Sequence, residues 1–171
     1  MVQALQIRDR EPSHIDNLLA DPRAVREAYN PMGTTALHRA AEIGSKYLEK
    51  MLDAGGDPGT LDSLGRSPVH YAASAGQDEA VRLLVSRGAD PGLQDSARGD
   101  TPLHTACRHG LDSTVRVLVL ECGAAFDGPG VVRFSDGFTP LVEASRWGHA
   151  NCLRGLLGFP ALVGAMGASP L

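Results

Sequence analysis

The segment GDTPLHTACRHG, at residues 99–110, recurs three more times along the chain. The other copies are GTTALHRAAEIG (33–44), GRSPVHYAASAG (65–76) and GFTPLVEASRWG (137–148). Their first glycines lie at positions 33, 65, 99 and 137, so the segment returns after 32, 34 and 38 residues. A period of this length indicates a solenoid of stacked supersecondary units rather than one large core.

Each copy carries the signals that begin and end a short helix. A threonine or serine stands where its hydroxyl can cap the helix, and proline follows at the first helical position in three copies. A second glycine closes each copy, where a left-handed residue is favoured at a helix end. Largely apolar segments follow, such as 80–85 and 115–119, and they predict a second helix that packs on the next layer.

A period near 33 residues with a TPLH-x-A centre resembles the ankyrin repeat, which is a turn followed by two helices. The resemblance implies an all-α repeat solenoid, in which helix-turn-helix pairs are joined by β-hairpin-like loops. Residues 1–171 would then form a single ankyrin-repeat domain. We expect repeat 1 at 30–61, repeat 2 at 62–95, repeat 3 at 96–133 with an insertion at about 121–135, and repeat 4 at 134–157. Insertions in repeat proteins map to surface loops, so we expect this one at the surface.

The two ends of the chain depart from the repeat pattern. Residues 1–29 look like a degenerate N-terminal capping repeat, with Leu5 and Ile7 in a first helix and a polar outer side. Residues 158–171 form an apolar C-terminal tail without a charged side chain, although a terminal repeat usually needs a polar outer face. Two interpretations stay open: further repeats follow in a longer parent protein, or the tail folds back or docks onto something.

Two narrower resemblances rest on short stretches. GDTPLHTACRHG with a lengthened loop after it is similar to the ankyrin domains of inhibitors of NF-κB, which bind Rel-family transcription factors. The length and repeat number are similar to those of the ankyrin-type inhibitors of cyclin-dependent kinases. Because both likenesses are local, the identity of the partner and the pathway stay open.

Composition excludes several classes of protein. The net charge is −4, so the chain lacks the basic field of a general nucleic-acid binder. Three widely spaced cysteines, Cys107, Cys122 and Cys152, do not make a disulfide framework. Reduced thiols favour an intracellular location, in the cytoplasm, the nucleus or both. We expect neither a secretory signal nor a membrane span, because no apolar segment of the required length exists.

The histidines and cysteines do not form a reactive site. His38, His70 and His104 occupy the same slot of successive repeats, and stacked helices lie about 8–10 Å apart. Zinc ligands must approach one ion to about 2.1 Å, so we expect these histidines to make structural hydrogen bonds within each TPLH turn. Cys107 and His109 are two residues apart on a helix and do not face each other. We therefore expect no metal, no cofactor and no enzymatic activity.

The candidate binding residues follow from the resemblance. Ankyrin proteins commonly bind partners through their hairpin tips and the exposed side of their first helices. Alignment on the tip glycine carries these positions over to Met32, Leu64, Arg66, Arg98, Asp100, Arg108, His109, Phe138, Arg146 and Trp147. Trp147 is the only tryptophan, and binding hot spots are enriched in Trp, Tyr and Arg. We weigh this interpretation against one in which Trp147 packs under the C-terminal tail.

Four of these residues are arginines on the expected concave side, although the chain is acidic. They would attract an acidic peptide or partner, unless they only keep that face soluble. We therefore expect a non-catalytic protein-interaction module that acts as an adaptor, scaffold or inhibitor. The alternative is the substrate-recruiting ankyrin portion of a larger enzyme or complex. The oligomeric state stays open, with the apolar C-terminus as one contact surface.

Overall fold

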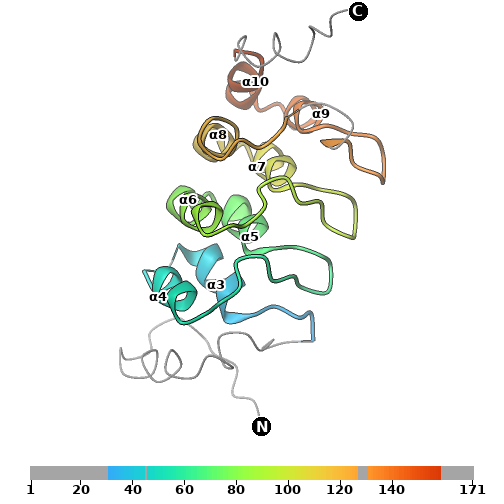
Figure 1. Ribbon diagram of the computed structural model, residues 1–171. Helices are drawn as coiled ribbons and strands as arrows, with labels where there is room; N and C mark the ends of the chain where they lie inside the picture. Colours follow the sequence, from blue (N-terminus) through green and yellow to red (C-terminus); the bar gives the residue numbers. More distant parts are fainter. Residues whose placement is uncertain (1–30, 45, 127–130, 159–171) are drawn as a thin grey trace, which may run out of the picture.

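The computed structural model describes residues 31–44, 46–126 and 131–158. The described residues form helix pairs in a stack and contain no β-strand, which confirms the all-α repeat solenoid (Figure 1). The pairs are α3 (Ala36–Ile43) with α4 (Leu48–Asp53), α5 (Pro68–Ala75) with α6 (Asp78–Ser86), α7 (Pro102–His109) with α8 (Asp112–Arg116), and α9 (Pro140–Arg146) with α10 (Ala150–Leu157). A π-helical segment, η1 (Val117–Glu121), continues α8.

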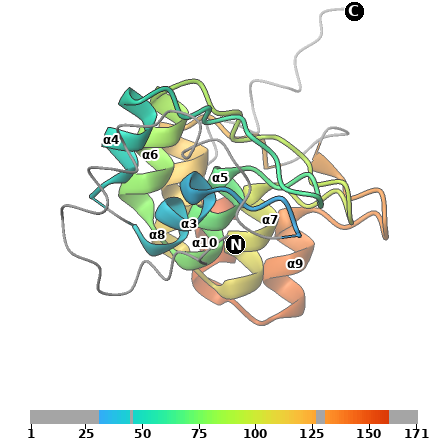
Figure 2. The same cartoon turned by 90° about the horizontal axis from the view of Figure 1, so that it is seen from below.

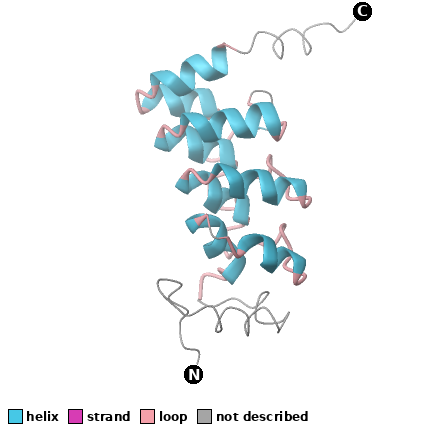
Figure 3. Cartoon of the chain, turned by 90° about the vertical axis from the view of Figure 1, so that its left-hand side faces the viewer, coloured by secondary structure: helices cyan, strands magenta, loops and turns pink. Residues whose placement is uncertain are grey.

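The helices form two layers, which we name by their position. The inner helices α3, α5, α7 and α9 pack side by side, and the outer helices α4, α6, α8 and α10 form a second layer, which lies to the left in Figure 1 and faces the viewer in Figure 3. The loops that precede the inner helices project together on one side of the stack, as the view along the stack shows (Figure 2). These loops and the inner helices together border the concave face.

The inner helices begin and end where the sequence predicts. Thr101 caps α7, and its hydroxyl oxygen accepts a hydrogen bond from the backbone nitrogen of His104 at 3.4 Å. Pro102 occupies the first turn, where a backbone N–H has no partner within the helix, so the N–H that proline lacks costs no hydrogen bond. Gly110 ends the helix with a φ of 69°, and its backbone nitrogen donates to the carbonyls of Ala106 and Cys107. The motif is therefore a complete helix unit with its own start and stop.

Small residues let the inner helices approach closely. The alanines that recur at one position of the inner helices are at most 1% exposed: Ala40, Ala72, Ala106 and Ala144. Larger aliphatic side chains fill the space between the layers, among them Leu84 and Leu118, both fully buried. The core is thus a series of thin shared layers, and each repeat depends on its neighbours for burial.

The loops before the inner helices are closed like β-hairpins. The backbone nitrogen of Asp62 donates to the carbonyl of Arg66 at 3.0 Å, and Asp95 pairs with Asp100 in the same way at 2.9 Å. Adjacent loops are also joined, because the backbone nitrogen of Ser96 donates to the carbonyl of Leu64 at 2.8 Å. The row of hairpins is therefore hydrogen-bonded from one repeat to the next.

The recurring histidine links each repeat to the following one. Nδ1 of His70 accepts a hydrogen bond from the backbone nitrogen of Ser67 at 3.1 Å, so its Nε2 carries the proton. Nε2 then donates to the carbonyl of Asp100, in the next hairpin, at 3.0 Å. The same pattern holds for His38 and His104. These contacts confirm the structural role expected for the three histidines.

Some expectations fall outside the described residues, and one is wrong. The capping repeat at 1–29 and residues 159–171 of the apolar tail lie outside them, as do residues 127–130 of the insertion. The insertion at 121–135 is not wholly a surface loop, because Val131 is 4% and Arg133 only 2% exposed. Burial of Arg133 is possible because three carboxylates surround its guanidinium. None of the helices in the described ranges is long and apolar enough to cross a membrane.

Candidate partner-binding groove

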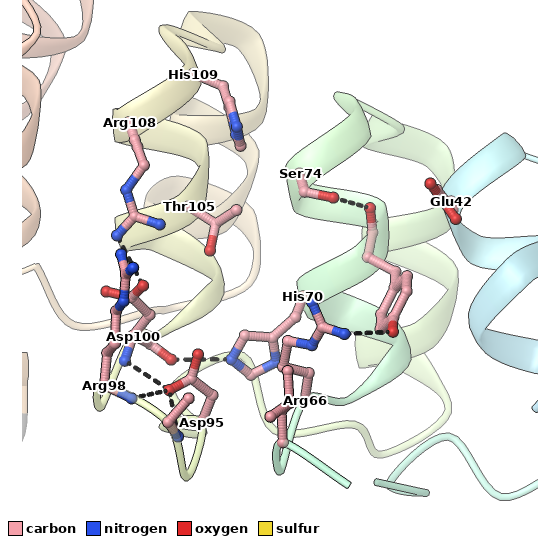
Figure 4. Close-up of a pocket in the computed structure, with 13 residues that line it drawn as sticks. Glu42, Arg66, His70, Ser74, Asp95, Arg98, Asp100, Thr105, Arg108 and His109 are labelled. Atoms are coloured by element: carbon pink, nitrogen blue, oxygen red, sulfur yellow. Dashed lines mark hydrogen bonds and ion pairs between the residues drawn. The ribbon is translucent and has the colours of Figure 1, made fainter. Parts of the chain in front are cut away.

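A cavity of about 520 Å³ lies on the concave face between repeats 2 and 3. The inner helices α5 and α7 supply Tyr71, Ser74, Thr105 and Arg108, and the hairpins supply Leu64 and Arg98, among others. Figure 4 shows Ser74, Thr105 and Arg108 on the two helices, with the hairpin residues Asp95 and Arg98 below them. The cavity is therefore a polar cleft between successive repeats rather than an enclosed pocket.

A second cavity of about 330 Å³ continues toward repeat 4. It shares Arg98 and Arg108 with the first cavity and adds Arg133, Ser135, Arg146 and Trp147, among others. Because two residues border both cavities, we treat them as one feature and call it the concave groove. The groove runs across repeats 2, 3 and 4.

The structure brings most of the predicted binding residues to this groove. Those that line it are Leu64, Arg66, Arg98, Asp100, Arg108, His109, Arg146 and Trp147. Phe138 borders it indirectly, since the Arg146 guanidinium lies 5.6 Å from the centre of the Phe138 ring. Met32 lines neither cavity and lies at the first hairpin tip, 46% exposed.

Arg66 is anchored by groups of its own repeat. Its guanidinium lies 2.7 Å from Asp62. It also donates to the hydroxyl of Tyr71 at 2.8 Å, a contact that Figure 4 marks with a dashed line. Burial alone would raise the pKa of Asp62, but hydrogen bonds from Arg66, Tyr71 and Leu64 outweigh it and hold that pKa below its ordinary value. The Arg66 charge is therefore largely compensated within the repeat.

Asp100 differs from the accessible tip residue that we expected. It is only 4% exposed, and its two carboxylate oxygens lie 2.7 Å from Arg108 and 3.0 Å from Arg133. Burial acts to raise the pKa of Asp100, but the two guanidiniums outweigh it and lower the pKa below its usual range. Asp100 therefore supports the floor of the groove, and Arg108 is held there with it.

Two functional candidates were missed by the sequence analysis, namely Arg133 and Glu143. Both side chains are 2% exposed, and Nη2 of Arg133 lies 2.6 Å from Oε1 of Glu143. Glu143 also accepts from Nε of Arg108 at 3.3 Å and from the indole nitrogen of Trp147 at 3.0 Å. Together with Asp100, these residues form a cluster that we call the buried ion network. It fixes two predicted binding residues, Arg108 and Trp147, to the floor of the groove.

A sequence signal for this network existed in the alignment of the repeats. Arg133 stands at the hairpin position that holds Asp62 and Asp95 in the preceding repeats, as the pairing of its backbone nitrogen with the Phe138 carbonyl shows. Glu143 stands where α5 and α7 have Tyr71 and Thr105. A basic residue in an acidic slot, with a new acid on the adjacent helix, indicates a compensating pair.

Two guanidiniums in the groove have no carboxylate partner within ion-pair distance among the residues that the structure describes. Arg98 is exposed and contributes only backbone hydrogen bonds, to Asp95 and Ser135. Arg146 is also exposed and stacks on the Phe138 ring. Trp147 lies beside them in the cavity lining with 56% of its surface exposed. Two uncompensated cations and a large aromatic ring therefore meet in the half of the groove over repeats 3 and 4.

The described residues contain neither a cluster of metal-ligating side chains nor an activated thiol at Cys107. They contain no group of three or more His, Cys, Asp or Glu side chains that could hold a metal ion. Cys107 is fully buried, and burial raises the pKa of its thiol far above the ordinary value. A thiol in that state is a poor nucleophile.

Comparison with known proteins shows the same repeat elsewhere. A family model described as ankyrin repeats (3 copies) matches residues 2–95 and 87–162. The chain is 36% identical over 76 residues to the ADP-ribosylation factor GTPase-activating protein AGD4 of Arabidopsis thaliana, a stretch that covers 42% of this chain and 10% of that protein. It is 30% identical over 95 residues to a putative ankyrin repeat-containing protein of Treponema pallidum, covering 55% of this chain and 32% of the other.

A third relative aligns with nearly the whole chain. The tyrosine-protein kinase HTK16 of Hydra vulgaris is 29% identical over 161 residues, which cover 92% of this chain and 16% of the kinase. The chain thus spans less than a third of the length of these relatives. The family match covers most of the chain and coincides with the helix pairs and hairpins described above. The chain therefore belongs to the ankyrin-repeat family, whose repeats are protein-interaction modules.

Proposed function

We propose that the chain is a non-catalytic module that binds another protein in its concave groove, and that it acts as an adaptor, scaffold or inhibitor. The observation that carries this proposal is the continuity of the groove across three repeats, lined by exposed arginine, histidine and tryptophan side chains. Interfaces of this kind draw most of their binding energy from a few Trp, Tyr and Arg residues.

The buried ion network supports the same proposal. It holds Arg108 and Trp147 in place from below, so these side chains lose less conformational freedom when a partner binds. Backbone hydrogen bonds between adjacent hairpins add to the rigidity of the face. A preorganised surface favours recognition of one partner shape.

A second candidate function follows from the relatives. Two of them are named as enzymes, a GTPase-activating protein and a tyrosine kinase, and the matched stretch is a small part of each. By analogy, the chain would recruit substrate for a catalytic domain elsewhere in a longer protein. Mass spectrometry of the endogenous protein tests this candidate, because peptides from outside the present sequence support it and their absence from a fully covered protein contradicts it.

Affinity capture from a lysate of the source cells tests the leading proposal. Three proteins are compared by quantitative mass spectrometry: the wild type, a groove variant and an outer variant. The groove variant carries His109→Ala and Trp147→Ala, and the outer variant carries Leu120→Ala and Arg116→Ala on exposed positions of the α8–η1 segment. Circular dichroism shows that all three are folded.

The proposal expects partners that are lost from the groove variant and retained by the outer variant. Equal capture by all three proteins contradicts it. Selective loss from the outer variant contradicts it as well, because the binding surface would then lie on the outer helices.

A further inference from the structure

The charge of the groove changes along its length. The cavity between repeats 2 and 3 is lined by three arginines and three acidic residues: Arg66, Arg98 and Arg108, with Glu42, Asp95 and Asp100. The cavity toward repeat 4 is lined by four arginines and two acidic residues: Arg98, Arg108, Arg133 and Arg146, with Asp136 and Glu143. Arg98 and Arg108 belong to both linings, so the first lining is balanced and the second has two more arginines than acidic residues.

The excess resides on two particular side chains. Arg108 and Arg133 are engaged with the carboxylates of the buried ion network. Arg98 and Arg146 line the same cavity, and no carboxylate of the described ranges lies within ion-pair distance of either. They come from different elements, since Arg98 lies on the hairpin before α7 and Arg146 is the last residue of α9. The cavity therefore offers two separate anion contacts.

Contacts with neighbouring residues hold both arginines in place. The backbone nitrogen of Arg98 donates to Asp95 at 2.8 Å, and its carbonyl accepts from the backbone nitrogen of Ser135 at 3.2 Å. Arg146 stacks on Phe138, whose backbone carbonyl accepts from Nε2 of His104. The backbone of Arg98 and the ring on which Arg146 stacks are thus held in place by the repeat stack.

We propose that the groove binds an acidic peptide segment of a partner protein in one direction. Two carboxylates of the peptide contact Arg98 and Arg146, an adjacent apolar side chain packs on Trp147, and the rest of the peptide runs over repeats 3 and 2. This inference rests on the proposed function and adds the chemistry and the direction of the partner.

Carboxylates on separate residues fit this cavity better than one phosphate group. Guanidinium and carboxylate groups form paired, charge-assisted hydrogen bonds, and two guanidiniums on different elements are matched by two such groups. A continuous polyphosphate backbone would next meet the balanced half, which offers no excess of positive charge. The difference between a balanced half and a half with two unpaired guanidiniums therefore favours a peptide whose acidic residues are at one end.

Selection from a random peptide display library tests the proposal on the full chain. The peptides enriched on the wild type are sequenced, and their dissociation constants are measured with the wild type and two double variants. In this experiment the groove variant is Arg98→Ala with Arg146→Ala, which differs from the His109→Ala, Trp147→Ala variant of the affinity capture. The matched control is Arg116→Ala with Arg154→Ala, which removes the same charge from exposed positions of α8 and α10.

We expect an excess of Asp and Glu in the enriched peptides. Their dissociation constants should rise at least about tenfold in the groove variant, because two charge-assisted contacts are lost, and by less than about twofold in the control. An enriched set without acidic residues, an equal effect of the two variants, or a selection that yields no binder overturns the proposal. A phosphoserine peptide that binds about tenfold more tightly than its glutamate counterpart also overturns it.

Failure of this inference can be told apart from failure of the proposed function. If the enriched peptides are not acidic but their binding is weakened by His109→Ala with Trp147→Ala, the inference is overturned and the groove remains the binding surface. If neither groove variant weakens the binding of the enriched peptides, the inference and the proposed function are both overturned. The test of direction uses a benzophenone group at the acidic end of an enriched peptide, which should crosslink to the tryptic fragments 134–146 or 147–154. A crosslink confined to repeat 2 overturns the direction.

Discussion

Nη2 of Arg133 lies 2.6 Å from Oε1 of Glu143, and both side chains are only 2% exposed. Arg133 belongs to the last described hairpin and Glu143 to α9, while Arg108 and Asp100, which join them, belong to repeat 3. The network of these four residues therefore connects two repeats beneath the concave groove. The proposed binding residues Arg108 and Trp147 depend on the same contacts that stabilise this end of the stack.

Replacement of Arg133 by alanine should strongly destabilise the protein. The change leaves Asp100 and Glu143 buried with one guanidinium fewer, and loss of one member of a buried ion pair costs about 3–5 kcal/mol. Urea unfolding followed by circular dichroism measures the effect. Arg116→Ala is the control, because Arg116 pairs with Asp112 at the surface, where an ion pair contributes about 1 kcal/mol or less. Equal losses in the two variants would contradict a structural role for the network.

The repeat architecture could be predicted from the sequence because its causes are local. The capping hydroxyl, the proline, the small residue and the closing glycine each act within one copy of the motif. The inner helices therefore begin, as expected, directly after the capping residues Thr35, Ser67, Thr101 and Thr139. The structural role of the histidines followed from their spacing alone. The order in which the helix pairs stack likewise follows from the period of the motif.

The buried ion network could not be predicted with the same ease. Its members come from two hairpins and two helices, and their distances depend on how adjacent repeats are stacked. The long segment before repeat 4 also obscured the register in which Arg133 corresponds to Asp62. Burial of Asp100 has the same origin, because it needs guanidiniums from both α7 and the following hairpin.

Stability should fall as the pH decreases from 7 to 5. Burial lowers the pKa of His38, His70 and His104 below the ordinary value of 6.5, so the folded state binds fewer protons than the unfolded state in this range. Their contribution is fully present above pH 6.5 and is lost as the pH falls below it. Urea unfolding at several pH values measures the slope.

A histidine variant provides the control for this pH dependence. His104→Gln should reduce the slope, since one of the three buried groups no longer titrates. It should also lower the stability at pH 7.5 by about 1–3 kcal/mol, because the hydrogen bond to the Phe138 carbonyl is lost or weakened. An unchanged slope would show that other groups cause the pH dependence.

Gly99→Ala should be more destabilising than Gly148→Ala. Both glycines have positive φ, 81° and 73°, so each substitution carries a similar backbone cost of about 1–2 kcal/mol. A Cβ atom at Gly99 would lie 2.9 Å from the backbone nitrogen of Phe134, whereas one at Gly148 would meet nothing within 4 Å. Urea unfolding of the pair isolates the cost of the contact between adjacent hairpins, and equal losses would show that this contact adds nothing.

Fluorescence of Trp147 should report directly on binding. It is the only tryptophan in the chain and is 56% exposed, so its emission in the free protein should be that of an indole in contact with water. A partner bound in the groove should shift the emission to shorter wavelength and reduce quenching by acrylamide. Saturated binding with unchanged emission and quenching would place the partner elsewhere on the molecule.

The dissociation constant of the strongest captured partner tests the central claim most directly. It should be measured by isothermal titration calorimetry with the wild type, with the Arg98→Ala, Arg146→Ala groove variant, and with the Arg116→Ala, Arg154→Ala control. Binding in the concave groove predicts a rise of at least about tenfold for the groove variant and almost no change for the control. Equal affinity of all three proteins would contradict contact of the partner with Arg98 and Arg146, and with it the account of an acidic segment bound in the concave groove.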